Sequence, residues 1–353
     1  MIPLDQIVQG DCIELLRNVK EPFADLVFAD PPFNIGYQYD VYEDKKAYDE
    51  YHRWTRDWMT ACKGILRPAG SFWIAIGAEY AAEVRFIGRE LGLTLRNWVI
   101  WHYTFGQNTK RKFARSHAHL FYFTMNPTEF TFNDEAVRTF SDRERVYRDK
   151  RADPKGRIPD DVWTEFPRVC GTFGEREGWH PCQMPEPLLA RIVRVCSNLG
   201  DAVFDPFSGS GTTAAAAKRL GRRYAGTDIS HDYVKNANQR LSEIQPYSEM
   251  DLGGDGQWPE ELLGLLNIAY GEFALPTDKL HANPHLFERF VERFRHRLRH
   301  SGIERMYSAE EIWRQLEMLR KSVKLVKIRA HADESASHPI RMTPSETQNR
   351  LLW

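Results

Sequence analysis

One stretch of the sequence, Asp201–Leu220, constrains the fold more than any other. The apolar run AVF is followed by the turn DPFSGSGTT and then by the alanine-rich AAAAKRL. A buried strand, a glycine-rich turn and a helix in this order are typical of an α/β sheet, and the turn lies at the carboxyl end of the strand. Gly209 and Gly211 let the backbone pass close to a ligand. The stretch therefore predicts a ligand site at this edge of the sheet.

The surroundings of the turn narrow the class of ligand. No Gly-Lys-Ser/Thr follows it, which excludes a P-loop. Asp228 ends the next apolar run about twenty residues later, where an acid can accept hydrogen bonds from ribose hydroxyls. The glycines alone leave NAD open, because Ala214 stands near the position of a third glycine. We expect an adenosine-type cofactor.

A second stretch, Asp30-Pro31-Pro32-Phe33, follows the apolar run Asp25–Ala29. Proline lacks the N–H that a central strand needs, and it restricts the residue before it, so the strand must stop at Asp30. A carboxylate, two restricted backbone carbonyls and an aromatic face then lie within four residues. This combination suits the binding of a flat ring that carries an amino group.

Apolar runs extend the same pattern along the chain and predict a mostly parallel sheet flanked by helices. We expect strands at residues 6–12, 24–29, 71–77, 95–103, 119–124, 201–205 and 224–229, and helices at 13–16, 47–66, 78–91, 187–196, 214–220 and 231–244. Residues 34–46 read as a surface loop.

Two regions depart from this pattern. Residues 126–179 contain few aliphatic runs and cannot build a large core of their own, so they are either disordered or a substrate-reading insertion. Residues 245–260 resemble a linker, and the remainder is mostly helical with a polar end that we expect to be disordered. A helix there has an apolar stripe (Phe287, Phe290, Val291, Phe294, Leu298), expected in a core or interface, and arginines that face either DNA or water (Arg289, Arg293, Arg295, Arg297, Arg299).

Charge and cysteine content exclude several classes. The formal net charge is −1, so any nucleic-acid-binding surface must be local. Five cysteines without a repeated C-x-x-C spacing argue against a metal site and a disulfide framework. No signal peptide or bilayer-spanning run is visible, so we expect a cytoplasmic protein.

Taken together, the two stretches resemble those of the amino-directed DNA methyltransferases that make N6-methyladenine or N4-methylcytosine. Asp30–Phe33 looks like the catalytic tetrapeptide of that family, and Asp205–Thr213 like its S-adenosylmethionine loop. The catalytic stretch comes first, as in the permuted β-type subgroup. Gly10-Asp11-Cys12 and His180–Leu189 resemble two further cofactor segments of the subgroup, although Met184 stands where that family usually has lysine.

The resemblance implies an α/β Rossmann-like methyltransferase with an inserted recognition region and a helical C-terminal extension. The implied domains are a catalytic half at 1–125, a target-recognition insertion at 126–179, a cofactor-binding half at 180–245 and the extension at 246–353. Its implied partners are S-adenosylmethionine and double-stranded DNA, with a homodimer left open and no metal needed. A companion restriction enzyme would make it part of a restriction-modification system.

The implied site residues form three groups. The catalytic group is Asp30, Pro31, Pro32 and Phe33. The cofactor group comprises Asp11, Cys12, Asp30, His180, Gln183, Asp205, Phe207, Ser208, Gly209, Ser210, Gly211, Thr212, Thr213 and Asp228. A basic stretch between two strands offers phosphate contacts through Lys110, Arg111, Lys112 and Arg115, or is a solvated loop.

Several alternatives accompany the leading prediction of an adenine-N6 methyltransferase. An Asp-first tetrapeptide favours adenine in this family, and cytosine-N4 is the runner-up. Pro181-Cys182-Gln183 imitates the nucleophilic motif of cytosine-C5 enzymes, but it precedes the cofactor loop, so we expect Cys182 to be a small residue near the cofactor. The remaining alternatives are an RNA or protein methyltransferase and a DNA-binding relative that does not transfer methyl groups.

Overall fold

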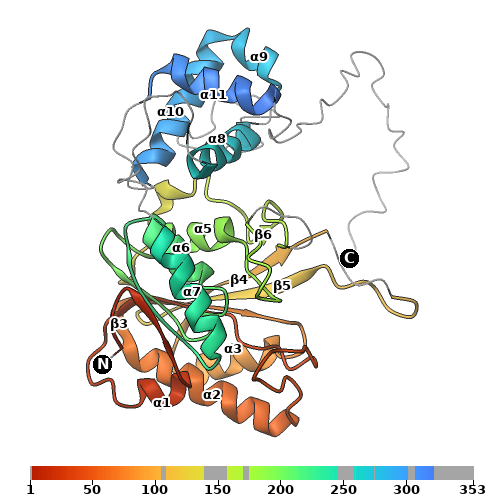
Figure 1. Cartoon of the computed structure of the whole chain (residues 1–353), viewed down its shortest axis with the longest axis vertical. Coiled ribbons are helices and arrows are strands. Elements are labelled where there is room, and N and C mark those ends of the chain that lie inside the picture. The colour runs from red at the N-terminus through yellow and green to blue at the C-terminus, as the bar shows by residue number, and fades with distance from the viewer. Residues whose placement is uncertain are drawn as a thin grey trace, which may run out of the picture.

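An eight-stranded sheet forms the centre of the molecule (Figure 1). The computed structural model describes residues 2–104, 109–138, 157–169, 175–244, 258, 260–273, 275–300 and 307–321. The strands lie in the order β1-β8-β7-β2-β3-β5-β4-β6. Their bounds are β1 Gln6–Gln9, β2 Ala24–Ala29, β3 Leu66–Ile76, β4 Thr94–His102, β5 His117–Thr124, β6 Val162–Trp163, β7 Ala202–Asp205 and β8 Arg223–Asp228.

Helices cover both faces of this sheet. Figure 1 shows α1, α2 and α3 on one face and α5, α6 and α7 on the other, with α8 to α11 gathered beyond the second face. The helices are α1 Cys12–Leu16, α2 Tyr48–Ile65, α3 Ala81–Glu90, α5 Glu186–Cys196, α6 Thr212–Arg219, α7 His231–Glu243, α8 Glu260–Phe273, α9 Thr277–His281, α10 Pro284–His300 and α11 Ala309–Lys321, with a 3₁₀ turn at Asp134–Ala136. None of the described helices is long and apolar enough to cross a membrane.

The sheet is mostly parallel, which confirms the predicted fold class. Among the described strands only β5 runs antiparallel, and it does so to both of its neighbours, β3 and β4. The sequence pattern did not indicate this reversal. No helix connects β4 to β5 among the residues described there, and strands joined without such a crossover return antiparallel.

Alternating side chains of the strands feed two cores. Leu26 and Phe28 of β2 pack with the helices of one face, whereas Val27 and Ala29 pack with α2 and α3 on the other. This period of two is expected for a sheet buried on both sides, and it makes the central strands apolar throughout. A one-residue slip of β2 would exchange the two sets and is therefore strongly disfavoured.

The neighbouring strands β2 and β7 bring the two key stretches together. They pair in parallel, with Leu26 opposite Val203 and Val27 opposite Phe204. Parallel neighbours end at the same edge of a sheet, so the loops that begin with Asp30 and Asp205 emerge side by side. These loops lie far apart in the sequence, and the sheet alone makes them adjacent.

The described parts of 126–179 pack onto the main core. Strand β6 pairs with β4, and the Trp101 indole donates to the carbonyl of Phe166 over 2.8 Å. Trp163 lies 5.8 Å from the ring of Trp73. The insertion therefore adds an edge strand to the sheet.

The C-terminal helices bury the apolar stripe of α10, as predicted, with Phe290 and Phe294 fully enclosed. The expectation that the arginines of this helix face DNA or water is wrong for two of them. Arg295 donates to the carbonyl of Tyr307, and Arg297 pairs with Glu272, so both hold the extension together. The polar C-terminal end and most of the predicted linker lie outside the described residues.

Candidate active site

The turn after β7 takes the strained shape that its glycines allow. Gly209 and Gly211 have positive φ angles of 47° and 73°, a region that side chains disfavour. A Cβ on Gly209 would lie 2.7 Å from Nε2 of His180. The carboxylate of Asp205 accepts the N–H of Phe207 over 2.9 Å and fixes the start of the turn. Glycine is thus required by both torsion and space.

Two further acids complete the framework around this turn. Asp228, at the end of β8, accepts the N–H of Gly209 over 2.8 Å and that of Ser230 over 2.9 Å. Asp11 caps α1 by accepting the N–H of Ile13 over 2.7 Å. Each acid is therefore held by backbone donors while it still faces the space above the turn.

That space is a cavity of about 120 Å³, here called the first cavity. Twelve residues of the predicted cofactor group line it, as does Pro32 of the tetrapeptide. The twelve are Asp11, Cys12, Asp30, His180, Asp205, Phe207, Ser208, Gly209, Ser210, Thr212, Thr213 and Asp228. Gly211 and Gln183 do not line it; Gly211 instead serves as the N-cap of α6.

The charge of the first cavity decides between the cofactors that the glycines left open. Five aspartates line it, and no lysine or arginine does so among the described residues. Burial lowers the pKa of His180 to about 4, so its imidazole is neutral near pH 7. A cleft of one sign favours the opposite charge. The sulfonium and ammonium groups of S-adenosylmethionine fit this lining, whereas the pyrophosphate of NAD does not.

Asp30 lies where the first cavity meets a second one, and it lines both. Burial, together with the charge of Asp205, raises the pKa of its carboxyl to about 8, and Arg168 opposes them. Burial likewise raises the pKa of Asp205 to about 7, although hydrogen bonds from Thr213 and the N–H of Phe207 oppose the shift. Both carboxyls therefore change their ionisation near neutral pH.

The second cavity measures about 390 Å³ and has aromatic walls. Pro31 and Phe33 of the tetrapeptide line it together with Trp101 and Tyr103. The Tyr51 hydroxyl of α2 donates to the carbonyl of Pro32 over 2.6 Å and holds the tetrapeptide in place. No described donor bonds the carbonyl of Pro31. The cavity can therefore take a flat ring beside one carboxyl and one unused carbonyl.

The loop at 34–46, predicted to lie on the surface, is instead partly a wall of both cavities. Tyr39 lines both, Tyr37 lines the second and Tyr42 the first. Buried Asp44 folds the loop back by accepting three backbone N–H groups, and Asp40 bonds the hydroxyl of Ser230. The density of tyrosines was the signal that sequence reasoning read only as loop character. Arg168, beside Asp30 in the second cavity, carried no such signal.

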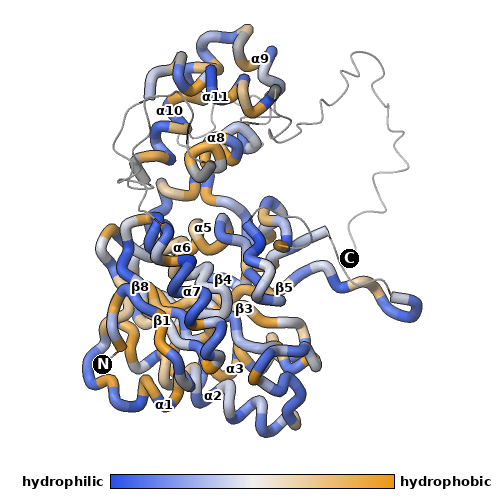
Figure 2. The backbone as a smooth tube through the Cα atoms, in the orientation of Figure 1, coloured by the Kyte–Doolittle hydropathy of each residue, from blue (hydrophilic) through white to orange (hydrophobic). Residues whose placement is uncertain are grey.

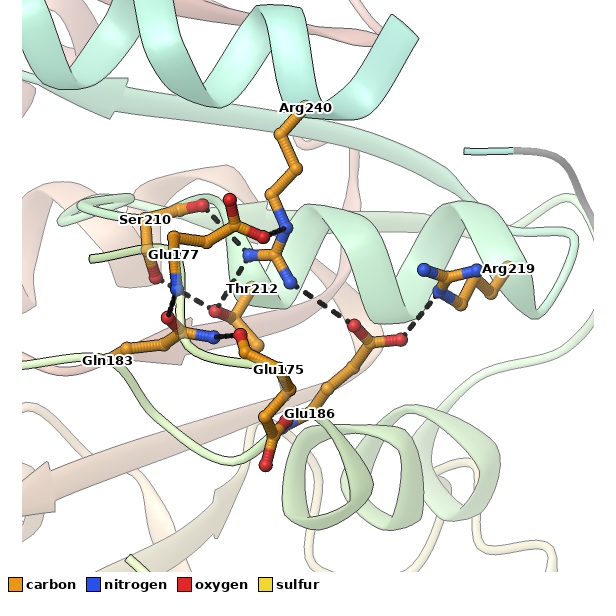
Figure 3. A network of polar contacts seen from close by, with 8 residues as sticks. All are labelled: Glu175, Glu177, Gln183, Glu186, Ser210, Thr212, Arg219 and Arg240. Carbon is orange, nitrogen blue, oxygen red and sulfur yellow. Dashed lines mark hydrogen bonds and ion pairs between the residues drawn. The ribbon is translucent and has the colours of Figure 1, made fainter. Parts of the chain in front are cut away.

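Gln183, predicted to bind the cofactor, lines the second cavity rather than the first, and its side-chain amide bonds backbone groups. Its amide donates to the carbonyl of Glu175 over 2.6 Å and accepts the N–H of Glu177 over 2.9 Å. Figure 3 shows the network around it: Arg240 of α7 pairs with Glu177 over 2.9 Å and donates to the carbonyl of Ser210 over 3.0 Å. Gln183 therefore fixes a backbone segment that α7 ties to the cofactor loop.

The predicted DNA-contacting residues divide into two kinds. Lys110, Arg111 and Lys112 lie outside both cavities, on the connection between β4 and β5. Arg115 lines the second cavity and binds both oxygens of Glu79, at 2.6 and 2.5 Å. The charge of Arg115 is therefore already neutralised by Glu79. Lys110, Arg111 and Lys112 form no ion pair with any described residue.

Cys182 lines both cavities, as expected for a small residue near the cofactor. Burial raises the pKa of its thiol, so the sulfur stays protonated at neutral pH. A cytosine-C5 enzyme needs a thiolate nucleophile, and the environment of Cys182 opposes one. Within the described residues there is also no cluster of three or more His, Cys, Asp or Glu side chains that could hold a metal ion.

Comparisons with known proteins agree with this geometry. A sequence model of the N6/N4 methyltransferases, described as DNA methylase, matches residues 24–239. The type II methyltransferase M.HpaI of Haemophilus parainfluenzae is 33% identical over 251 residues, covering 70% of this chain and 78% of the relative. The DNA adenine methyltransferase YhdJ of Escherichia coli K12 is 33% identical over 254 residues, covering 70% and 85%.

Among solved structures, a putative DNA modification methylase of Thermus thermophilus in complex with S-adenosyl-L-methionine is 22% identical to this chain. The match has a TM-score of 0.48 and covers 68% of this chain and 98% of that one. The family match includes both the tetrapeptide and the glycine-rich turn. The chain therefore belongs to the DNA methylase family, whose methyl donor is S-adenosylmethionine.

Proposed function

We propose that this protein methylates the exocyclic N6 amine of adenine in double-stranded DNA. The observation that carries the proposal is the position of Asp30, at the junction of an acidic cofactor cavity and an aromatic cavity. Of the two relatives, YhdJ is named as a DNA adenine methyltransferase. That name, together with the Asp-first tetrapeptide, supports adenine over cytosine-N4.

The residues of the chain position the target amine and stabilise the charge that develops on it during methyl transfer. Bound S-adenosylmethionine provides an electrophilic methyl group. Asp30 accepts one N–H of the target amine and the carbonyl of Pro31 accepts the other, which favours a nitrogen lone pair directed out of the ring. Phe33 stacks on the base. Since the amine is unreachable within the duplex, the base must leave the stack at a cost of a few kcal/mol.

The proposal assigns the remaining parts of the chain as well. Residues 126–179 read the target sequence, because their described segments border the aromatic cavity through Arg168 and Val169. Exchange of 128–178 for the insertion of a relative should change the methylated sequence. A cytoplasmic location belongs to the proposal because both relatives are bacterial proteins named as methyltransferases; a homodimer stays a prediction.

The decisive experiment expresses the chain in methylation-free cells and maps modified bases on their DNA by single-molecule sequencing. N6-methyladenine at a recurring sequence is expected; N4-methylcytosine or unmodified DNA would refute the proposal. Asp30→Ala should lose methyl transfer and keep measurable cofactor binding. Substantial residual transfer by that variant would overturn the catalytic role of Asp30.

A further inference from the structure

An unusual aromatic side chain lies on the connection between β4 and β5. Phe113 is 100% exposed, whereas every phenylalanine of the cores is enclosed. A single exposed apolar side chain is common on protein surfaces, so exposure alone does not indicate a partner. Phe113 is distinguished by the full exposure of its ring together with the charges of the neighbouring residues. A second exposed phenylalanine, Phe86 of α3 at 54%, is partly covered by the guanidinium of Arg89, 4.8 Å from its ring.

The surroundings of Phe113 are basic. Lys110, Arg111 and Lys112 precede it directly, and none forms an ion pair with the residues that the structure describes. Figure 2 shows the described part of this connection projecting from the body of the protein. An aromatic ring among free cations on a projecting segment matches the chemistry of DNA, which offers phosphates outside and flat bases inside.

The position of this segment relates it to the aromatic cavity. Tyr103 on one side of the connection and Arg115 and His117 on the other line that cavity. Phe113 is two residues from Arg115, so their Cα atoms lie within about 7 Å. Phe113 therefore lies close in the chain to residues that line the cavity that would receive a flipped base.

A flipped base leaves a gap in the duplex that must be filled or closed. Proteins that distort DNA commonly insert apolar side chains between base steps, and stacking on an aromatic ring contributes about 1–3 kcal/mol per base. We propose that Phe113 inserts into the DNA stack and fills the space left by the target adenine, while the three cations contact the flanking phosphates. This inference rests on the proposed function and assigns to Phe113 a positioning role in base flipping.

The test compares two DNA duplexes that carry the mapped target site. One is fully paired; in the other the target adenine faces an abasic site, so no base pair opposes flipping. Phe113→Ala should lower kcat/KM on the paired duplex by about tenfold or more, given the stacking energy above. The loss should be much smaller on the abasic duplex. Phe113→Trp should retain activity on both, and 2-aminopurine at the target should show reduced flipping by the alanine variant.

Phe86→Ala is the matched control, because it removes an exposed ring beside an arginine on a different surface; it should leave both rates unchanged. An equal loss on the two duplexes, or no loss on the paired one, would overturn the inference. Melting curves of the variants check folding. Because Phe113 is fully exposed, its substitution should leave the melting temperature unchanged. Failure of the proposed function differs clearly, since the wild-type protein would then methylate neither duplex.

Discussion

The coupling between Asp30 and its two charged neighbours predicts the pH dependence of methyl transfer. The ionised carboxylate accepts a hydrogen bond from the target amine more strongly than the protonated acid does, so the rate should follow its ionisation. With a pKa of about 8, the carboxyl is about one-tenth ionised at pH 7 and about nine-tenths ionised at pH 9. The active fraction of the free enzyme, and with it kcat/KM, should therefore rise about ninefold between pH 7 and pH 9.

Two substitutions should shift that profile in opposite directions. Asp205→Asn removes a negative neighbour that raises the pKa of Asp30, so the rise in rate should move to lower pH. The asparagine can still accept the N–H of Phe207, which preserves the turn. Arg168→Gln removes a cation that lowers the same pKa, so the rise should move to higher pH.

The assay is kcat/KM for DNA between about pH 6 and pH 9.5, at saturating cofactor and constant ionic strength. A bound cation lowers the pKa of nearby carboxyls, so the wild-type midpoint should fall at or below about pH 8, and the signs of the two shifts carry the test. A flat profile, or shifts of the same sign in both variants, would refute the reasoning. The control is a surface ion pair whose residues line neither cavity: Arg56→Gln, which removes the partner of Glu90, should leave the profile unchanged.

Three further predictions concern the architecture of the site. Cys182→Ser should retain methyl transfer, because the buried thiol has no covalent role; a dead variant that still binds cofactor would contradict this. Tyr51→Phe removes the 2.6 Å hydrogen bond to the tetrapeptide, worth about 1 kcal/mol, and should slow single-turnover transfer more than it weakens cofactor binding. Gly209→Ala should destabilise the fold by about 1–2 kcal/mol and weaken cofactor binding measured by calorimetry, because φ is 47° and the new Cβ meets His180 at 2.7 Å. Gly92→Ala, at φ 75° with no atom within 4 Å of the added Cβ, separates strain from collision; equal losses of cofactor binding in both would argue against the contact.

Local patterns in the sequence predicted most strands and helices of the sheet region. The strand before Asp30 and the turn at Gly209 were recognisable because proline and glycine restrict or extend backbone geometry within a few residues. The same local reading singled out Asp30, Gly209 and Asp228 of the first cavity, whereas the rest of the predicted cofactor group, including Asp11 and His180, came from the family resemblance. The local reading could do so because the end of a strand and a glycine-rich turn are determined by residues that are adjacent in the sequence.

Local sequence patterns did not predict which strands pair or which distant residues contact each other. The pairing of β2 with β7 depends on strand order, which no single segment encodes. The reversal of β5 depends on a connection rather than on the strand itself. Gln183 was assigned to the cofactor by resemblance, yet its amide bonds a backbone segment eight residues away. The partner of a polar side chain is decided by tertiary packing, and sequence distance does not reveal it.

The acidic lining of the first cavity has a consequence for the exchange of cofactor and product. Methyl transfer converts a sulfonium into an uncharged thioether, so the spent molecule carries one positive charge fewer than the donor. Binding of the cation should expel protons from Asp30 and Asp205, whereas the thioether should allow the pair to take protons up again. The cavity should therefore bind the charged donor more tightly than the uncharged product, and rising pH should strengthen that preference.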